Sequence, residues 1–474
     1  MKFFKLFLIF GFVLNLQSQT KVASIQKDFG NLKQAFNVVD ETTGNFAIFL
    51  EESDKVTGIL YDKNFNEIGS VVAPDLSSKF KAILGYQIQG NKISLLLNTV
   101  NGRSYGVYHF NFETGEGTSK ELDFKVRKEK FIEAISYKNS IYILTVPLFT
   151  SQLNVYEFNN IESPLVHEIV LNENDLLDRR DRGIKLFDLV DKRDISMIYQ
   201  ENPNSLEATS KDFKVYQNGE TVYLTSDKYK EFTQLLKVSL KTFKTETKRI
   251  LNVGIDGSKV GTQTNSFLCK DKLFQIGIDS DYLKFQVVDL TTDTIIKKIE
   301  THEDENLNFI NTPILIENAD FQKYRELERT RQFFRKIREG DIAISVLYEN
   351  ETYQITLGGV SEQVGYAFFL GFNFGLAGSL VVIAINPTTN SYWGYTYTKS
   401  VRVTGLFDDN FNMVEGEVPP NIFDKMNDTQ TLDLLGGNEK LSISAETVFK
   451  LDNFFIKGFY LKNAETYYLV KYDK

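Results

Sequence analysis

One pattern of roughly fifty residues recurs along the chain and constrains its fold more than any other feature of the sequence. Its clearest copy, Gly90 to Lys120, reads GNKISLLLNTVNGRSYGVYHFNFETGEGTSK. Ile93 to Leu97 is a short apolar run, Tyr105 to Phe112 alternates polar and apolar residues, and Asn101-Gly102 lies between them. Asn-Gly between two such runs predicts a β-hairpin, because both residues accept the positive φ of a type I′ turn. The unit therefore reads as strands of a small antiparallel sheet.

Four further copies of this unit extend the repeat over much of the chain. They begin at Gly44, Lys138, Asn218 and Lys270, so successive starts are 46, 48, 80 and 52 residues apart. The longest interval contains a charged segment, Asn172 to Gly183, which we interpret as a looped insertion. Four-stranded units that recur at such a period are typical of a β-propeller.

The two ends of the chain predict how the ring closes. The last residues, DNFFIKGFYLKNAETYYLVKYDK, supply a central strand and a third strand and then stop. Lys21 to Lys27 is a lone alternating strand without a unit of its own. Joining the two would protect the sheet edge and anchor both termini. We predict an all-β fold, a single propeller domain over residues 20–474 with seven four-stranded blades. Six or eight blades remain open, because residues 300–445 do not follow the repeat.

Two segments depart from the repeat and are predicted to be insertions. Residues 318–340 fit a long helix: Asn318 or Asp320 could cap it, and Gly340 is well placed to end it. Its apolar residues keep a helical period, at Phe321, Tyr324, Leu327, Phe334 and Ile337. Residues 366–385, YAFFLGFNFGLAGSLVVIAI, form an apolar stretch without a charge.

The first 19 residues have the features of a secretory signal peptide. Lys2 and Lys5 form a charged start, Leu6 to Leu16 is an apolar core, and small or polar residues follow at Ser18 and Thr20. This core is shorter than the roughly 20 residues that a membrane-spanning helix needs. The sequence therefore predicts export, to the periplasm, the outer-membrane surface or the extracellular space.

Charge and cysteine content bound the partners and the source of stability. The formal charge is −9, and loss of Lys2 and Lys5 with the signal makes it −11. Such an acidic chain is not expected to bind nucleic acid. A single cysteine, Cys269, cannot form an internal disulfide, and its apolar surroundings predict that it is buried. Stability must then come from the core.

The two insertions supply the candidate contact residues. The apolar stretch most resembles a buried hairpin inserted in blade six. An exposed loop that touches a membrane or a partner, and a true membrane span, are the alternatives. The candidate contacts there are Phe368, Phe369, Phe372, Phe374 and Trp393.

The segment 318–340 carries seven Lys or Arg and four Asp or Glu residues, a local net of +3. Its arginines Arg325, Arg329 and Arg335 could meet an acidic partner or anionic lipid. A solvated face, helped by pairs such as Glu326 with Arg329 and Glu328 with Arg331, is the favoured interpretation.

Other chemical signatures are weak. Asp62, Asn64 and Asn66, and again Asp408, Asn410 and Asn412, have the alternating oxygens of a calcium loop but lack its glycine and final glutamate, so they read as turns. The three histidines, His109, His167 and His302, lack partners at zinc-ligand spacing. The sequence contains no nucleophile elbow, phosphate loop or dinucleotide fingerprint. We therefore assign no catalytic residue, metal or cofactor.

Two C-terminal segments carry a resemblance, ADFQKYRELERTRQFFRKIREGDIAISV and YTKSVRVTGLFDDNFNMVEGEVPPNIFDKM. They resemble a group of exported, propeller-like bacterial proteins without an assigned activity. The similarity covers the C-terminal third, and elsewhere only the repeat pattern. It implies the fold and the compartment, and it implies that residues 358–387 are a variable insertion.

These patterns leave two classes of function. The first is a noncatalytic binding or scaffolding protein of the bacterial cell envelope, with an envelope protein, a glycan or a membrane surface as partner. The alternative is a hydrolase or lyase that acts on an extracellular polymer through carboxylates in the propeller funnel.

Overall fold

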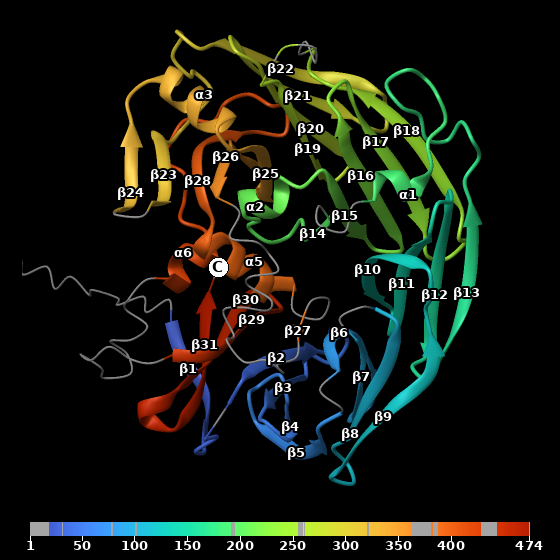
Figure 1. Cartoon of the computed structure of the whole chain (residues 1–474). Coiled ribbons are helices and arrows are strands. Elements are labelled where there is room, and N and C mark those ends of the chain that lie inside the picture. Colours follow the sequence, from blue (N-terminus) through green and yellow to red (C-terminus); the bar gives the residue numbers. More distant parts are fainter. Residues whose placement is uncertain are drawn as a thin grey trace, which may run out of the picture.

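The β-propeller predicted from the repeat is confirmed. The computed structural model describes residues 19–30, 32–76, 79–99, 102–190, 195–254, 259, 261–319, 322–362, 381–382, 387–427 and 443–473 of the 474-residue chain. The described strands form seven sheets. Figure 1 shows these sheets following one another around a ring in chain order. We number them sheet 1 to sheet 7 in that order.

Apart from the short strand β27, sheets 1 to 3 come from the first 170 residues. Sheet 1 contains β2 (Gln34–Val39), β3 (Phe46–Glu51), β4 (Lys55–Tyr61) and β5 (Glu67–Pro74). Sheet 2 contains β6 (Phe80–Gln89), β7 (Lys92–Thr99), β8 (Ser104–Asn111), β9 (Glu116–Lys125) and the short β27 (Val381–Val382). Sheet 3 contains β10 (Glu129–Tyr137), β11 (Ser140–Pro147), β12 (Gln152–Asn160) and β13 (Ser163–Val170).

Sheets 4 and 5 are also built from consecutive strands. Sheet 4 contains β14 (Ile195–Ile198), β15 (Phe213–Asn218), β16 (Thr221–Tyr229), β17 (Phe232–Ser239) and β18 (Thr245–Leu251). Sheet 5 contains β19 (Gln263–Cys269), β20 (Lys272–Ile278), β21 (Tyr282–Asp289) and β22 (Thr294–His302).

Sheets 6 and 7 have less regular connections. Sheet 6 contains β23 (Ile314–Ala319), β24 (Gln322–Leu327), β25 (Asp341–Glu349), β26 (Thr352–Glu362) and β28 (Lys399–Phe407), in the order β24-β23-β28-β26-β25. Sheet 7 contains β29 (Ile443–Leu451), β30 (Phe454–Leu461), β31 (Thr466–Asp473) and the N-terminal β1 (Gln19–Gln26). The helices are α1 (Leu186–Leu189), α2 (Leu206–Thr209), α3 (Thr330–Arg338), α5 (Pro387–Tyr397), α6 (Ile422–Asn427) and the 3₁₀ turn η1 (Lys462–Ala464).

Apolar cores lie between adjacent sheets. The rings of Phe49 in sheet 1 and Phe110 in sheet 2 are 4.8 Å apart, and Phe46 lies 5.4 Å from Phe449 of sheet 7. Strand β3 is buried at every residue, whereas the outer strand β22 is largely exposed. This gradient explains the repeat: inner strands read as apolar runs and outer strands as amphipathic ones. Gly102 and Gly115 adopt φ of 67° and 73° in the turns of sheet 2, as the turn signals predicted.

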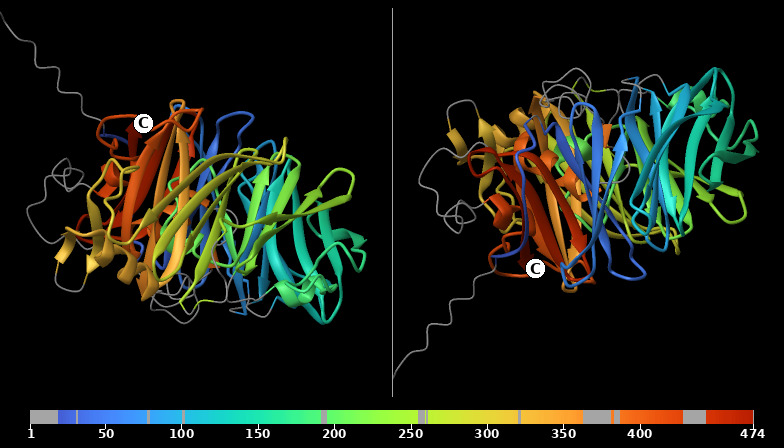
Figure 2. Two further views of the ribbon diagram at one scale, coloured as in Figure 1. Left: turned by 90° about the horizontal axis from the view of Figure 1, so that it is seen from above. Right: turned by 90° about the horizontal axis from the view of Figure 1, so that it is seen from below.

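The predicted closure by both termini is confirmed. β1 pairs antiparallel with β31 from Gln19↔Tyr472 to Gln26↔Thr466. It completes sheet 7 as the outer strand that the C-terminal unit lacks. Figure 2 shows the ring from above and from below its view in Figure 1, with the C-terminus on this sheet.

Removing β1 tests this closure. A chain that starts at residue 27 should melt roughly 5 °C below one that starts at residue 20, because Val22, Ala23 and Ile25 lose their contacts with the core. The exposed edge of β31 should also promote self-association. Calorimetry and light scattering of the two chains measure both effects. Equal melting temperatures and monodisperse samples would contradict a closing role for β1.

Elements from two connections lie inside the ring. Figure 1 shows α2, α5 and β27 there. The segment between β26 and β28 supplies α5 and β27, and β27 pairs in parallel with the inner strand β6 at Ala82 and Ile83. In α5, Thr389 binds both the carbonyl of Val448 (2.8 Å) and its N–H (2.7 Å). The described parts of this connection therefore lie inside the ring, whereas the hairpin predicted over residues 366–385 lies outside the described residues apart from β27.

The predicted long helix over residues 318–340 is wrong in its first half. Among the described residues of this segment, only Thr330–Arg338 is helical, and β23 and β24 form a hairpin before it. Asn318 lies in β23 with φ of 54° and donates from Nδ2 to the carbonyls of Thr396 and Thr398, so it caps no helix. Gly340 does follow the helix closely, as predicted.

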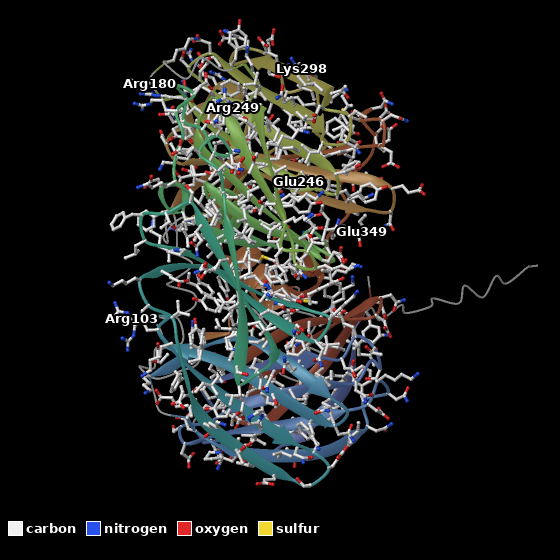
Figure 3. The ribbon with its side chains drawn as sticks, turned by 90° about the vertical axis from the view of Figure 1, so that its right-hand side faces the viewer. Arg103, Arg180, Glu246, Arg249, Lys298 and Glu349 are labelled. Atoms are coloured by element: carbon white, nitrogen blue, oxygen red, sulfur yellow. The ribbon has the colours of Figure 1, made fainter. Side chains whose placement is uncertain are left out.

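The outer strands carry mixed charges. Figure 3 shows labelled side chains on this side of the ring, among them Glu246, Arg249 and Lys298. Arg249 pairs with Asp181 of the predicted looped segment at 2.6 Å.

Within the described part of the chain, no helix is both long and apolar enough to cross a membrane.

Candidate functional site

A large cavity, which we call the funnel, lies at the centre of the ring. It has a volume of about 1290 Å³ and is lined from all seven sheets and by the start of α5. Its aromatic lining consists of Tyr86, Tyr137, Tyr199, Tyr223 and Tyr348. Its charged lining consists of Lys138, Lys270 and Lys450, and of Glu41, Glu201, Asp271 and Glu349. Both signs of charge therefore face the same space.

Several funnel side chains are held in place by their neighbours. Lys450 donates to Glu201 at 2.7 Å, and the ammonium of Lys270 lies 3.1 Å from the centre of the Tyr348 ring. The Tyr348 hydroxyl donates to Asp409 at 2.9 Å, and this hydrogen bond raises the pKa of Tyr348. An ordered aromatic surface beside opposite charges is typical of a binding face.

Two buried polar atoms of funnel-lining residues have no partner in the described structure. They are Nε2 of Gln200 and Oγ of Ser136. Gln200 is already anchored through Oε1, which accepts from the N–H of Lys270 at 3.1 Å. An orphaned buried donor costs about 1–3 kcal/mol, so both atoms need water or a ligand.

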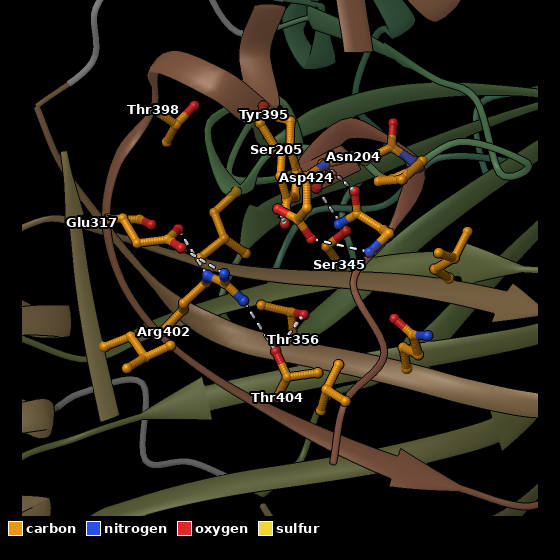
Figure 4. Close-up of a pocket in the computed structure, with 18 of the residues that line it drawn as sticks. Asn204, Ser205, Glu317, Ser345, Thr356, Tyr395, Thr398, Arg402, Thr404 and Asp424 are labelled. Atoms are coloured by element: carbon orange, nitrogen blue, oxygen red, sulfur yellow. Dashed lines mark hydrogen bonds and ion pairs between the residues drawn. The ribbon is translucent and has the colours of Figure 1, made fainter. Parts of the chain in front are cut away.

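A second cavity, the side pocket, lies against one face of sheet 6. It has a volume of about 650 Å³. Figure 4 shows Ser345, Thr356, Thr404 and Arg402 projecting into it from the sheet, with Tyr395, Thr398 and Asp424 beyond them. Strands β23, β25, β26 and β28 form its floor, and α5, α6 and residues 203–206 and 418–421 cover it.

Arg402 and Glu317 form the central ion pair of the side pocket. The guanidinium donates from Nε at 2.8 Å and from Nη2 at 2.5 Å, one bond to each carboxylate oxygen. Burial alone would lower the pKa of Arg402, but the hydrogen bonds and charge of Glu317 outweigh it and raise that pKa. The pair is therefore fully charged and satisfied internally.

Asp424 is the other ionisable group of the side pocket. Its carboxylate accepts from the Tyr395 hydroxyl at 3.1 Å and from the N–H of Asn421 at 3.0 Å. Water reaches it, but the protein around the mouth desolvates it and raises its pKa. The side pocket thus holds little net charge.

The structure describes Trp393 and the three arginines among the predicted contact residues. Phe368, Phe369, Phe372 and Phe374 lie outside the described residues. Trp393 lies on α5, half-buried against the cluster that includes Phe423 and Phe459.

The three predicted arginines lie on the hairpin and helix of sheet 6. All three are exposed: Arg325 lies on β24, Arg329 directly precedes α3, and Arg335 lies within α3. Arg335 lies 3.7 Å from Glu339, and Arg331 pairs with Glu303 at 3.2 Å rather than with the predicted Glu328. This arrangement fits a solvated face.

The remaining predicted features have structural roles. Asp62 accepts the N–H groups of Asn64 and Asn66 at 2.8 and 2.9 Å, and Asp408 repeats this pattern at 2.9 and 2.7 Å, so both segments are turns, as predicted. Cys269 is buried as predicted, and burial raises the pKa of its thiol to about 12. Among the described residues, no group of three His, Cys, Asp or Glu side chains could hold a metal ion.

The comparisons with known proteins add similarity of fold only. No family model and no curated protein matches the chain. The β-propeller domain of the trilobed protease of Pyrococcus furiosus is 8% identical, with a TM-score of 0.34 over 93% of this chain and 94% of that one. A prolyl endopeptidase is 7% identical, with a TM-score of 0.36 over 94% of this chain. A Synechocystis apocarotenoid oxygenase variant is 8% identical, with a TM-score of 0.29 over 56% of this chain. The chain spans 51% of the endopeptidase and 61% of the oxygenase.

Proposed function

We propose that this protein is a noncatalytic binding protein, exported to the bacterial cell envelope, that holds a polypeptide segment of a partner in its central funnel. The lining of the funnel carries this proposal. Its tyrosines offer flat apolar surface with a polar tip, the kind of side chain enriched at binding hot spots. Its lysines and carboxylates offer both signs of charge, which suits the mixed side chains of a polypeptide better than a neutral glycan.

The orphaned atoms support the same reading. The amide nitrogen of Gln200 needs an acceptor, and the hydroxyl of Ser136 can donate or accept. A peptide backbone supplies carbonyl acceptors and N–H donors at regular intervals. An extended segment laid across the funnel would bring such groups close to these two residues while its side chains meet the tyrosines.

The direct test is selection of binding peptides followed by a matched pair of charge reversals. The mature protein is screened against random peptides displayed on phage, and the enriched sequence is titrated by calorimetry. Lys138→Glu, in an exposed turn of the funnel, should change the dissociation constant about tenfold. Lys63→Glu makes the same charge change in an exposed turn of sheet 1 that does not line the funnel, and should change it less than twofold. Failure to enrich a peptide, or equal effects of the two variants, would contradict the proposal.

The hydrolase or lyase alternative has a distinct readout. Its carboxylates would be Glu41, Glu201, Asp271 and Glu349, which line the funnel from different sheets. Cleavage of a polysaccharide or peptide that is lost in Asp271→Asn or Glu349→Gln would favour this alternative. Binding without turnover would favour the noncatalytic function.

A further inference from the structure

One face of sheet 6 is polar and lies opposite α5 and α6 across the side pocket. The other sheets pack against each other through apolar side chains. In β28, Val401 and Val403 join the large core cluster, while Arg402 and Thr404 point to the side pocket. The same alternation occurs in β25, β26 and β23, which contribute Ser345, Thr356 and Glu317 to the pocket. Packing alone gives no reason to bury hydroxyls around an open space, because each must keep hydrogen-bond partners there. The face is built to meet something polar.

Several hydroxyl groups around the pocket use their protons inside the protein. Ser345 donates to the carbonyl of Asn204 at 3.0 Å, and Thr398 donates to that of Gly394 at 2.6 Å. Thr356 and Thr404 share one hydrogen bond of 2.9 Å, so at least one of their protons is also occupied. What these groups can offer to the cavity is lone pairs. A ligand of this pocket must therefore be rich in hydrogen-bond donors.

The charges of the pocket disfavour an anion as that ligand. Arg402 and Glu317 neutralise each other through two hydrogen bonds, and a ligand carboxylate or phosphate would have to displace Glu317. Tyr324, on β24, is 52% exposed and lines the pocket, so its ring forms an accessible apolar wall. Lone pairs on the sheet and one aromatic wall are complementary to a sugar ring, which has hydroxyl donors on its edge and apolar C–H groups on its faces.

We propose that the side pocket, which lies between sheet 6 and the helices α5 and α6, is a second binding site, separate from the funnel, and that it takes a neutral saccharide unit of a glycan. The ring of Tyr324 stacks on one face of the sugar. The hydroxyls of the sugar donate to the threonine and serine oxygens of sheet 6 and to Asp424. The site does not depend on the peptide-binding role of the funnel, because the linings of the two cavities have one residue in common, Leu347.

The test uses the mature protein and an array of neutral glycans, with chitotriose, cellotriose and maltotriose titrated in solution. Calorimetry and saturation-transfer NMR should detect at least one ligand with a dissociation constant on the order of 1 mM or tighter. Tyr324→Ala should weaken that binding about tenfold through lost stacking. Thr356→Val, which keeps the shape of the side chain, should weaken it severalfold. Both positions are at least partly exposed, so both variants should fold, and circular dichroism checks this.

Lys138→Glu provides the matched control, because it alters the funnel and leaves the side pocket untouched. Saccharide binding should be the same in this variant as in the wild type. The inference is overturned if no neutral glycan binds, or if the binding that is found survives both Tyr324→Ala and Thr356→Val. It is also overturned if Lys138→Glu abolishes the binding, which would place the sugar in the funnel. Loss of peptide binding in Lys138→Glu with intact sugar binding would support both sites separately.

Discussion

Replacing Lys214 by methionine should lower the free energy of unfolding by about 3–5 kcal/mol, the largest loss that we expect from any single substitution in this chain. The ammonium of Lys214 lies 2.9 Å from Oδ2 of Asp227, and both side chains are fully buried. Methionine fills much of the same volume but leaves the carboxylate without its counter-charge. A charge left unpaired in the interior costs more than the pair contributed, because its hydration is not restored.

The surroundings of Asp227 offer its carboxylate no replacement for the lost positive charge of Lys214. Its carboxylate also accepts from the Thr233 hydroxyl at 2.7 Å, and from the N–H and hydroxyl of Ser266 at 2.9 and 2.8 Å. Ser266 lies on β19, so the carboxylate joins sheet 4 to sheet 5. Water has no ready route to such a site. Loss of the lysine should therefore weaken the packing of two neighbouring sheets.

Chemical denaturation of the wild type and Lys214→Met measures the effect. Lys237→Met is the control, because Lys237 pairs with Glu246 at 3.2 Å on the exposed side of the same sheet. That substitution should cost less than about 1 kcal/mol. Similar losses for the two variants would mean that the buried pair is not a net source of stability.

The repeat could be predicted because it is local. Each unit encodes its strands by alternation and its turns by residues such as Gly102 and Gly115, which sit close together in sequence. The closure by β1 could be predicted in the same way. The N-terminal strand belongs to no unit of its own, and the C-terminal unit lacks its outer strand, so pairing the two completes one sheet. The predicted unit boundaries are nevertheless offset from the sheets. In sheet 1, for example, the predicted unit begins at Gly44, whereas the sheet begins with its innermost strand, β2, at Gln34.

The error over residues 318–327 has a nonlocal cause. Phe321, Tyr324 and Leu327 keep a helical period, and that period is compatible with an amphipathic helix. In the structure, β23 pairs with β28, as in Leu315↔Arg402, across more than 80 residues of chain. A short window of sequence contains no information on a strand partner so far away in the chain. The pairing of β23 with β28 overrides the local helical preference.

The side pocket was missed for a related reason. Strand β28 alternates Arg402 and Thr404 with Val401 and Val403, which reads as a strand with one face in water. The polar face is instead covered by α5, which directly precedes β28 in the chain, and by α6, which follows it. The signal for Arg402 and Glu317 was present as polar alternation. What the alternation could not reveal is that these side chains face a cavity.

Glu133→Gln should stabilise the protein at pH 8 by about 3 kcal/mol and should have little effect near pH 4. Glu133 lies on the inner strand β10 and is only 6% exposed. Burial raises the pKa of Glu133 to about 7, and only a hydrogen bond from the N–H of Ala134 opposes this. In the unfolded chain the carboxyl titrates near 4.3. The folded state therefore binds the proton more tightly than the unfolded state, and stability falls as the pH rises from about 4.3 through 7.

Glutamine removes this pH dependence because it keeps the shape of the protonated acid and cannot ionise. Urea denaturation at pH 4.5, 6 and 8 should give curves for the two proteins that coincide at the lowest pH and separate as the pH rises. Glu168→Gln, at an exposed position of β13 in the same sheet, should leave stability within about 0.5 kcal/mol at every pH. A constant difference between wild type and Glu133→Gln across this range would show that the carboxyl does not titrate in its buried site. A difference in unfolding free energy that grows with pH would show that the buried carboxyl of Glu133 destabilises the native fold when it ionises.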